Sequence, residues 1–153
     1  MSIDKFNNEG YFDPTTYAAL TKVEKEEQAA IKAADFRLFD GYRPLVYICS
    51  PFSGNIEENI KRARRYSRFA VEHNTIPITP HLLYPQFMDD TDPAERHVAC
   101  HKINYVLIGK CEEIWVFGSN ISKGMEYEIS IAQKRRQTIR YFSEECKEVS
   151  KNA

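Results

Sequence analysis

The chain has 153 residues, enough for one domain with a hydrophobic core and too few for two domains of ordinary size. Hydrophobic residues make up 42% and charged residues 28% of the sequence, which excludes disorder of the whole chain. The formal net charge of -1 gives no overall field that would attract nucleic acid or an anionic membrane. We therefore expect a globular protein with neither of these partners.

The N-terminal segment and the cysteines indicate the cellular compartment. The segment MSIDKFNNEGYFD has no apolar core of the length that a signal peptide needs, and nowhere do about 18 apolar residues follow one another. The four cysteines, Cys49, Cys100, Cys111 and Cys146, show no metal-binding or redox spacing. We expect reduced thiols in a cytoplasmic protein.

Residues 1–43 differ from the rest of the chain and predict a helical N-terminal extension. A helix is expected from about Pro14 to Phe36, with a weak apolar stripe and a charged KVEKEEQ centre. Gly41 and Pro44 then indicate a turn. We expect the helix to pack on the following domain or on a second subunit.

Strands and helices alternate between residues 44 and 143. The run LVYICS at 45–50 has the composition of a buried parallel strand, and Pro51, Ser53 and Gly54 end it. The elements expected after it are a helix from Asn55 to about His73, a strand at 75–80, an irregular connection with one short helix, a helix at 97–110, a strand at 113–118, a helix at 122–137 and a strand at 138–142. The polar residues 144–153 predict a tail that is frayed or briefly helical.

This alternation predicts the fold class. Strands that alternate with helices pair in parallel through right-handed crossovers. We therefore expect an α/β, Rossmann-like (flavodoxin-like) three-layer sandwich with a mainly parallel sheet of four to five strands, plus the N-terminal helix. In such sheets a ligand binds beyond the carboxyl ends of the strands, which selects the segments after residues 50, 80 and 118.

The turn after the first strand carries one group of candidate binding residues. Unpaired N–H groups in the first turn of a helix attract phosphate or carboxylate, so the segment SPFSGN predicts an anion site. An ordinary turn with Ser53 or Asn55 as N-cap is the other interpretation. The candidates are Ser50, Phe52, Ser53, Gly54 and, after the second strand, His81. Tyr84 and Phe87, in the long connection, are candidates for stacking on a base.

A second group follows the third strand, where Gly118, Ser119, Asn120, Ser122 and Gly124 precede or begin a helix. Glu126 and Glu128 lie two residues apart in the first turns of that helix, so they point in different directions around it. At most one of them can face the site. If neither does, both stabilise the positive end of the helix dipole.

These motifs resemble the nucleoside 2-deoxyribosyltransferases and their relatives, which include the 2'-deoxynucleoside 5'-monophosphate N-glycosidases. VYICSPFSG is similar to the family's first strand and turn, and GMEYEISIA is similar to the helix start that carries its nucleophilic glutamate. The likeness covers roughly residues 45 to 142, and small, mostly uncharacterised bacterial and phage proteins of the superfamily are more similar still. It implies that Glu128 is the nucleophile, that Tyr47 orients it, and that Ser122 contacts a substrate phosphate.

The resemblance also implies a general acid, and here the chain departs from the family pattern. The family has an aspartate eight residues before the acid that opens the next strand, whereas this chain has Asn104, whose amide cannot supply a titratable proton. His101 matches a histidine of the N-glycosidase branch and is the expected substitute, since it titrates near neutral pH. A leaving group that is already cationic, such as the nicotinamide of a dinucleotide, would need no acid.

The activity implied is cleavage or transfer at the N-glycosidic bond of a small-molecule nucleoside or nucleotide, without a cofactor and in a homo-oligomer. A carboxylate stabilises the oxocarbenium character at C1′ or traps it as an ester. The alternative is a catalytically silent nucleotide-binding sensor, sponge or regulatory module of the same fold. Tyr47, Ser122 and Glu128 favour the enzyme, and Asn104 favours the binding module.

The sequence does not favour a metal site or a nucleic-acid site. His97 and His101 stand one helical turn apart with Cys100 beside them, but a zinc site normally needs a third protein ligand, and none has recognisable spacing. The basic clusters at 61–68 and 133–137 lack interleaved aromatic residues and fit the solvated faces of helices better than a nucleic-acid site. We therefore expect no metal.

Overall fold

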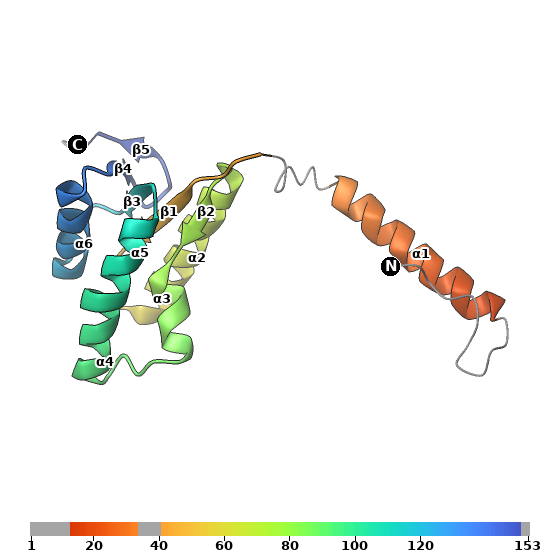
Figure 1. Ribbon diagram of the computed structural model, residues 1–153, viewed down its shortest axis with the longest axis horizontal. Coiled ribbons are helices and arrows are strands. Elements are labelled where there is room, and N and C mark those ends of the chain that lie inside the picture. Colours follow the sequence, from red (N-terminus) through yellow and green to blue (C-terminus); the bar gives the residue numbers. More distant parts are fainter. Residues whose placement is uncertain (1–12, 34–40, 151–153) are drawn as a thin grey trace. The chain divides into compact units, whose positions relative to one another are not determined.

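The computed structural model describes residues 13–33 and 41–150, which fall into two units divided after Gly41. In the first unit, helix α1 spans Pro14–Ala33 (Figure 1). The side chain of Asp13 caps it, because Oδ1 accepts a 3.0 Å hydrogen bond from the N–H of Thr16. The predicted helix is confirmed over these residues, and its expected last turn lies outside the described ones.

The second unit is built on a five-stranded sheet in the order β2-β1-β3-β4-β5. Its first four strands are parallel, and β5 is antiparallel to β4. The strands span Leu45–Cys49 (β1), Ile76–Ile78 (β2), Glu113–Phe117 (β3), Thr138–Phe142 (β4) and Glu148–Val149 (β5). This topology confirms the predicted fold class.

Helices cover both faces of this sheet (Figure 1). They are α2 (Ile56–Glu72), α3 (Pro80–Leu83), the 3-10 helix η2 (Tyr84–Gln86), α4 (Pro93–Val98), the π-helical segment η3 (Ala99–Ile103), α5 (Asn104–Lys110) and α6 (Lys123–Lys134). Because side chains alternate along a strand, each buried strand contributes to two cores. On one face Tyr47 and Cys49 pack with residues of α5 and α6, and on the other Val46 and Ile48 pack with α2.

The core under α2 is largely aromatic. The rings of Tyr66 and Phe117 stack with their centroids 4.2 Å apart, and Phe117 stacks on Phe142 at 4.9 Å. Trp115 is also almost fully buried there. This packing adds an aromatic contribution to the hydrophobic burial of each ring and fixes α2 against β1 and β3, the two strands that lead into the site.

The start of one helix and the C-terminal tail differ from the sequence-based expectations. The expected helix at 97–110 begins earlier, at Pro93, because Asp92 caps it by accepting a hydrogen bond from the N–H of Ala94 and because proline suits the first helical position. The expected frayed or helical tail is wrong for Glu148–Val149, which forms β5 instead. Glu148 accepts two hydrogen bonds from Arg140, of 2.9 and 2.8 Å, which hold β5 against the edge of the sheet.

The other boundaries agree with the expected ones to within a few residues. The second strand is shorter than expected and ends before Pro80, because this proline occupies the first turn of α3. The connection between β2 and α5 contains α3 and η2 before α4. It therefore holds more helix than the single short one expected from its sequence.

Candidate active site

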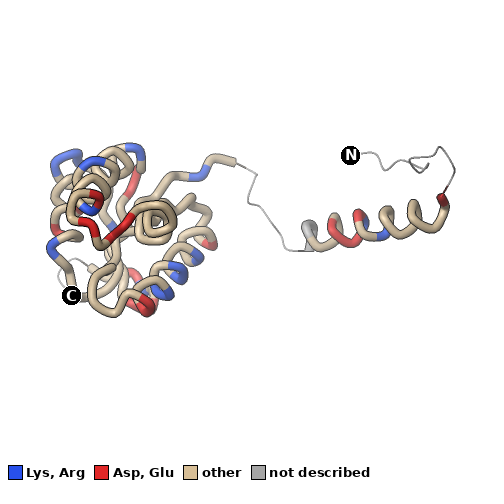
Figure 2. Tube along the Cα trace, turned by 90° about the horizontal axis from the view of Figure 1, so that it is seen from below, with Lys and Arg blue, Asp and Glu red and all other residues tan. Residues whose placement is uncertain are grey.

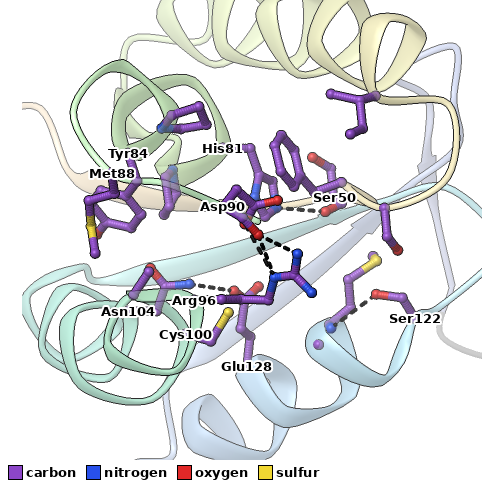
Figure 3. A pocket seen from close by; sticks show the side chains of 18 of the residues that line it. Ser50, His81, Tyr84, Met88, Asp90, Arg96, Cys100, Asn104, Ser122 and Glu128 are labelled. Carbon is purple, nitrogen blue, oxygen red and sulfur yellow. Dashed lines mark hydrogen bonds and ion pairs between the residues drawn. The ribbon is translucent and has the colours of Figure 1, made fainter. Parts of the chain in front are cut away.

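A cavity of about 560 Å³ opens beyond the carboxyl ends of β1, β2 and β3 (Figure 3). Its volume is in the range of small-molecule binding sites. Of the residues proposed from the sequence, those that line it are Ser50, Phe52, Ser53, Gly54, His81, Tyr84, Asn104, Ser122, Gly124 and Glu128. Each segment that follows one of these strands therefore contributes to one cavity.

The start of α6 determines which of its two acidic residues belongs to the cavity. Ser122 is the N-cap, and its Oγ accepts a 3.3 Å hydrogen bond from the N–H of Met125. With this start, Met125 and Glu128 face the sheet and are buried, whereas Glu126 is exposed to solvent. Glu128 is 5% exposed and lines the cavity.

Two hydrogen bonds fix one oxygen of the Glu128 carboxylate. The hydroxyl of Tyr47 donates to Oε1 at 2.8 Å, and Nδ2 of Asn104 donates to the same atom at 3.0 Å. The thiol of Cys49 also forms a hydrogen bond with Glu128. Tyr47 and Cys49 come from β1, and Asn104 is the first residue of α5, so the sheet and two helices together position the carboxylate.

Burial and hydrogen bonding act in opposite directions on this carboxyl group. Burial raises the pKa of Glu128, and the hydrogen bonds from Tyr47, Cys49 and Asn104 offset part of that increase. Burial and the neighbouring carboxylate also raise the pKa of Tyr47 well above its ordinary value, so this hydroxyl stays protonated as a donor. The site therefore holds a carboxylate that is more basic than one on the surface.

Four buried polar atoms of the cavity residues have no hydrogen-bond partner among the residues that the structure describes. Glu128 Oε2 and Asn104 Oδ1 are acceptors, and the hydroxyl groups of Ser50 and Tyr84 can donate. In Figure 3, Ser50 and Tyr84 lie on one side of the cavity, and Asn104 and Glu128 lie on the other. Because buried polar groups are nearly always satisfied, these four atoms are available to ordered water or to a polar ligand in the cavity.

His81 and Phe52 form an aromatic pair in the cavity wall. Their rings stack with centroids 5.0 Å apart. His81 Nε2 lies 2.8 Å from the carbonyl oxygen of Ser50, and a carbonyl only accepts, so Nε2 carries the proton. Burial lowers the pKa of His81, which leaves a neutral ring whose one N–H is already used.

The connection between β2 and α5 contributes cavity residues that the sequence interpretation did not select. Among them are Met88, Asp90, Arg96 and Cys100. Arg96 Nε lies 3.5 Å from Asp90 Oδ1, and both side chains are partly exposed at the cavity. Of the two aromatic residues proposed from this segment, Tyr84 lines the cavity, whereas Phe87 is exposed and does not. The segment has neither the period of a strand nor that of one long helix, so no pattern predicts the other residues of this wall.

The structure does not bring all of the predicted residues together. His101 is exposed, its ring contacts those of His97 and Tyr127, each at 4.6 Å, and it does not line the cavity. The expectation for His101 assumed a regular helix, in which residues three apart share a face. The π-helical segment that contains it changes this relation and turns His101 away from Asn104.

The loop after β3 also separates its candidates. Gly118 and Asn120 line a second cavity of about 340 Å³, which shares Ser53 and Ser122 with the first. Ser119 is exposed and lines neither of these two cavities. Gly118 has a φ of 91°, a conformation that favours glycine, at the turn that follows β3.

The described part of the chain offers little support for a metal, membrane or nucleic-acid site. Within residues 13–33 and 41–150, no group of three histidine, cysteine or acidic side chains could hold a metal ion. None of the helices described there is both long and apolar enough to cross a membrane. Lys and Arg positions are spread over several helices (Figure 2), and Arg62 and Arg68 of the 61–68 cluster form ion pairs with Glu144 and Glu72.

Comparisons with known proteins bear on the fold and the family of the chain. A family model described as a domain of unknown function (DUF7768) matches residues 44–142. No curated protein matches the chain. Among solved structures, a 2-deoxyribosyltransferase from the psychrotolerant bacterium Bacillus psychrosaccharolyticus is similar, with 16% sequence identity, a TM-score of 0.55, and coverage of 65% of this chain and 72% of that one. At this identity the likeness shows a shared fold.

Proposed function

We propose that this chain, which belongs to the family of the domain of unknown function DUF7768, cleaves the N-glycosidic bond of a nucleoside or nucleotide with Glu128 as the nucleophile. The fold shared with a 2-deoxyribosyltransferase supports a nucleoside-processing role. The residue assignments rest on the chemistry of the cavity.

The observation that carries the proposal is the arrangement around Glu128. Tyr47 and Asn104 both donate to Oε1, so the carboxylate is held in one orientation, while Oε2 has no partner within the described residues. A fixed carboxylate with one available oxygen suits attack on a carbon that develops positive charge. The raised pKa of Glu128 adds to the basicity of that oxygen.

The reaction would proceed at C1′ of the sugar. As the bond to the base weakens, C1′ acquires oxocarbenium character, which Oε2 of Glu128 stabilises or traps as a glycosyl ester. Water then releases the sugar, or a second base accepts it. Hydrolysis gives an N-glycosidase and transfer gives a deoxyribosyltransferase, and both use the same carboxylate.

Ser122 is our candidate for binding a 5′-phosphate. It caps α6, where unpaired N–H groups and the helix dipole favour an anion. Arg96 and Lys123 also line the cavity and supply positive charge. We therefore propose a nucleoside monophosphate as the substrate class, in keeping with the N-glycosidase branch, and we retain the homo-oligomeric state as a prediction.

A catalytically silent binding module is the second candidate, and Asn104 favours it. An amide at hydrogen-bond distance from the carboxylate positions it but cannot donate a titratable proton to a leaving base. A protein of this kind would keep the cavity and bind a nucleotide without cutting it.

One experiment separates the two candidates. The protein is incubated with a panel of deoxynucleosides, their monophosphates and NAD, and free base is measured by chromatography, with Glu128→Gln as the inactive control. If the protein is an N-glycosidase, the wild type releases free base and Glu128→Gln does not. If the wild type releases no base but its thermal stability rises with a nucleotide, and Glu128→Ala changes that response, the binding module is correct.

A further inference from the structure

The proposed chemistry needs a proton for the departing base, and the residues near Glu128 do not supply it in the expected way. Asn104 is an amide, and His101 lies outside the cavity. His81 is inside, but its Nε2–H already donates to the carbonyl of Ser50. Burial lowers the pKa of this ring, which keeps it neutral and makes it a poor acid.

The carboxyl groups of the cavity already act as acceptors. Asp89 Oδ1 accepts from the N–H and the hydroxyl of Thr91, and Glu95 Oε2 accepts from the N–H of Asp89. Asp90 is paired with Arg96. The hydrogen bonds from Thr91 lower the pKa of Asp89, so this carboxyl group has no proton to give. The contacts of Asp90 and Glu95 engage these groups as acceptors, not as donors.

The direction of bond cleavage limits which side chains can donate the proton. A nucleophile attacks C1′ from the face opposite to the departing base, so the proton donor must stand across the cavity from Glu128. Cys100 lies on the same side as Glu128 in Figure 3, whereas Ser50 and Tyr84 lie on the opposite side. Of these last two hydroxyl groups, the phenol of Tyr84 is by far the stronger acid.

We propose that the hydroxyl of Tyr84 is the proton donor to the departing base, an inference that rests on the proposed N-glycosidic function. Tyr84 begins η2, lines the cavity, and is 8% exposed. Its hydroxyl is buried and has no hydrogen-bond partner among the described residues. Leaving such a group unpaired costs free energy that a bound ligand can recover by accepting its hydrogen bond.

The reaction balances with Tyr84 in this role. In the first step the C1′–N bond breaks, its electron pair stays on the base nitrogen, and this nitrogen takes the Tyr84 proton while Oε2 of Glu128 bonds to C1′. In the second step water attacks C1′, the ester bond breaks with its electron pair returning to the carboxylate, and a proton of the water restores the Tyr84 hydroxyl. The net change is hydrolysis.

The environment of Tyr84 keeps the donor protonated between turnovers. Burial, together with the charge of Glu128, raises the pKa of Tyr84 to about 12. The hydroxyl donates a hydrogen bond to the negative charge that develops on the base nitrogen, and the proton passes to this nitrogen as the C1′–N bond breaks. Tyr84 therefore contributes chiefly where the base leaves as an anion, and little where the base leaves as a neutral molecule from a cationic substrate.

The test is Tyr84→Phe on two substrates, 2′-deoxyguanosine 5′-monophosphate and its 7-methyl derivative, whose base is already cationic. The variant removes one oxygen and keeps the ring. We expect kcat for the first substrate to fall about 100-fold, as for loss of a general acid, with KM little changed. The rate with the methylated substrate stays close to that of the wild type. Tyr141→Phe, a half-buried tyrosine of β4 away from the cavity, is the matched control.

Several outcomes would overturn the inference. Equal slowing of both substrates by Tyr84→Phe, or no slowing of either, shows that the hydroxyl gives no proton to the base. Cleavage by the wild type of the methylated substrate alone shows that the site has no acid. Absence of base release from both substrates, with an intact fold by thermal unfolding, removes the proposed function and this inference with it.

Discussion

The hydroxyl of Tyr47 donates a 2.8 Å hydrogen bond to Oε1 of Glu128, although 81 residues separate the two in the sequence. Tyr47 reaches the carboxylate from the middle of β1, and Glu128 reaches it from the second turn of α6. The bond ties β1 to α6, the helix that follows the neighbouring strand β3. Substitution of either residue should therefore affect both the reaction and the stability of the fold.

Glu128→Gln should abolish base release, because an amide oxygen is too weak a nucleophile to trap C1′. The fold should be retained, since the amide has nearly the same shape. Glu126→Gln is the matched control, because Glu126 lies two residues earlier in the same helix and is exposed. Chromatographic assay of free base checks both variants, and equal losses would show that the assignment of roles within α6 is wrong.

The same substitution should change stability in a pH-dependent way. Because burial raises the folded-state pKa of Glu128 above its ordinary value of 4.5, the folded protein binds more protons than the unfolded chain between these two values. The stability that this residue contributes to the folded state is therefore fully present below pH 4.5 and is lost as the pH rises through the folded-state pKa. Gln carries no charge at any pH.

We accordingly expect Glu128→Gln to be more stable, relative to the wild type, at neutral pH than at pH 4.5 or below. Urea unfolding of both proteins at the two pH values gives the difference directly. If the wild type instead becomes more stable relative to the variant as the pH rises, the hydrogen bonds lower the pKa of Glu128 by more than burial raises it.

Tyr47→Phe should weaken both the fold and the reaction. It removes a buried hydrogen bond to a charged group, a change of about 1.5–3 kcal/mol in the free energy of unfolding. It also removes a donor that lowers the pKa of Glu128, so the acidic limb of the profile of kcat/KM against pH should move to higher pH. A loss of stability with an unmoved limb would assign Tyr47 a structural role alone.

Asn104→Asp should give the site a pH dependence that the amide does not have. Asn104 now donates to Oε1 of Glu128, and an aspartate can do so only when it is protonated. Two carboxyl groups this close share one proton, which raises the pKa of the pair. We expect base release to shift toward acidic pH and stability to fall at alkaline pH; identical pH profiles for variant and wild type would contradict this.

Ser122→Ala and Ser122→Gly together test the phosphate assignment. Alanine removes the cap of α6 and lowers the free energy of unfolding by about 1 kcal/mol, whereas glycine at this position lowers it by only about 0.3 kcal/mol. Both variants remove the hydroxyl. We expect both to lose the preference for monophosphate over free nucleoside, measured as the ratio of the two values of kcat/KM, and an unchanged ratio in either would exclude the contact.

Much of the fold followed from the order of apolar segments. The strand predicted at 138–142 has these bounds in the structure, and the strands predicted at 45–50 and 113–118 each end one residue earlier. The antiparallel β5 could not be predicted in this way. It has only two residues, too few to show the alternating pattern of a strand. Its antiparallel pairing with β4 and the hydrogen bonds between Arg140 and Glu148 hold it in place.

The sequence by itself determined which strands end at the cavity, and the likeness to a known family selected Glu128 there. The tertiary structure decided which side chains surround that carboxylate: Asn104 as a donor, His101 excluded by a π-helical turn, and Tyr84 on the opposite wall. The physical reason is that the spacing of apolar residues along the sequence indicates which face of a single helix or strand is buried. Contacts between distant elements depend on how each helix is rotated and where each connection runs, and these follow from packing in three dimensions.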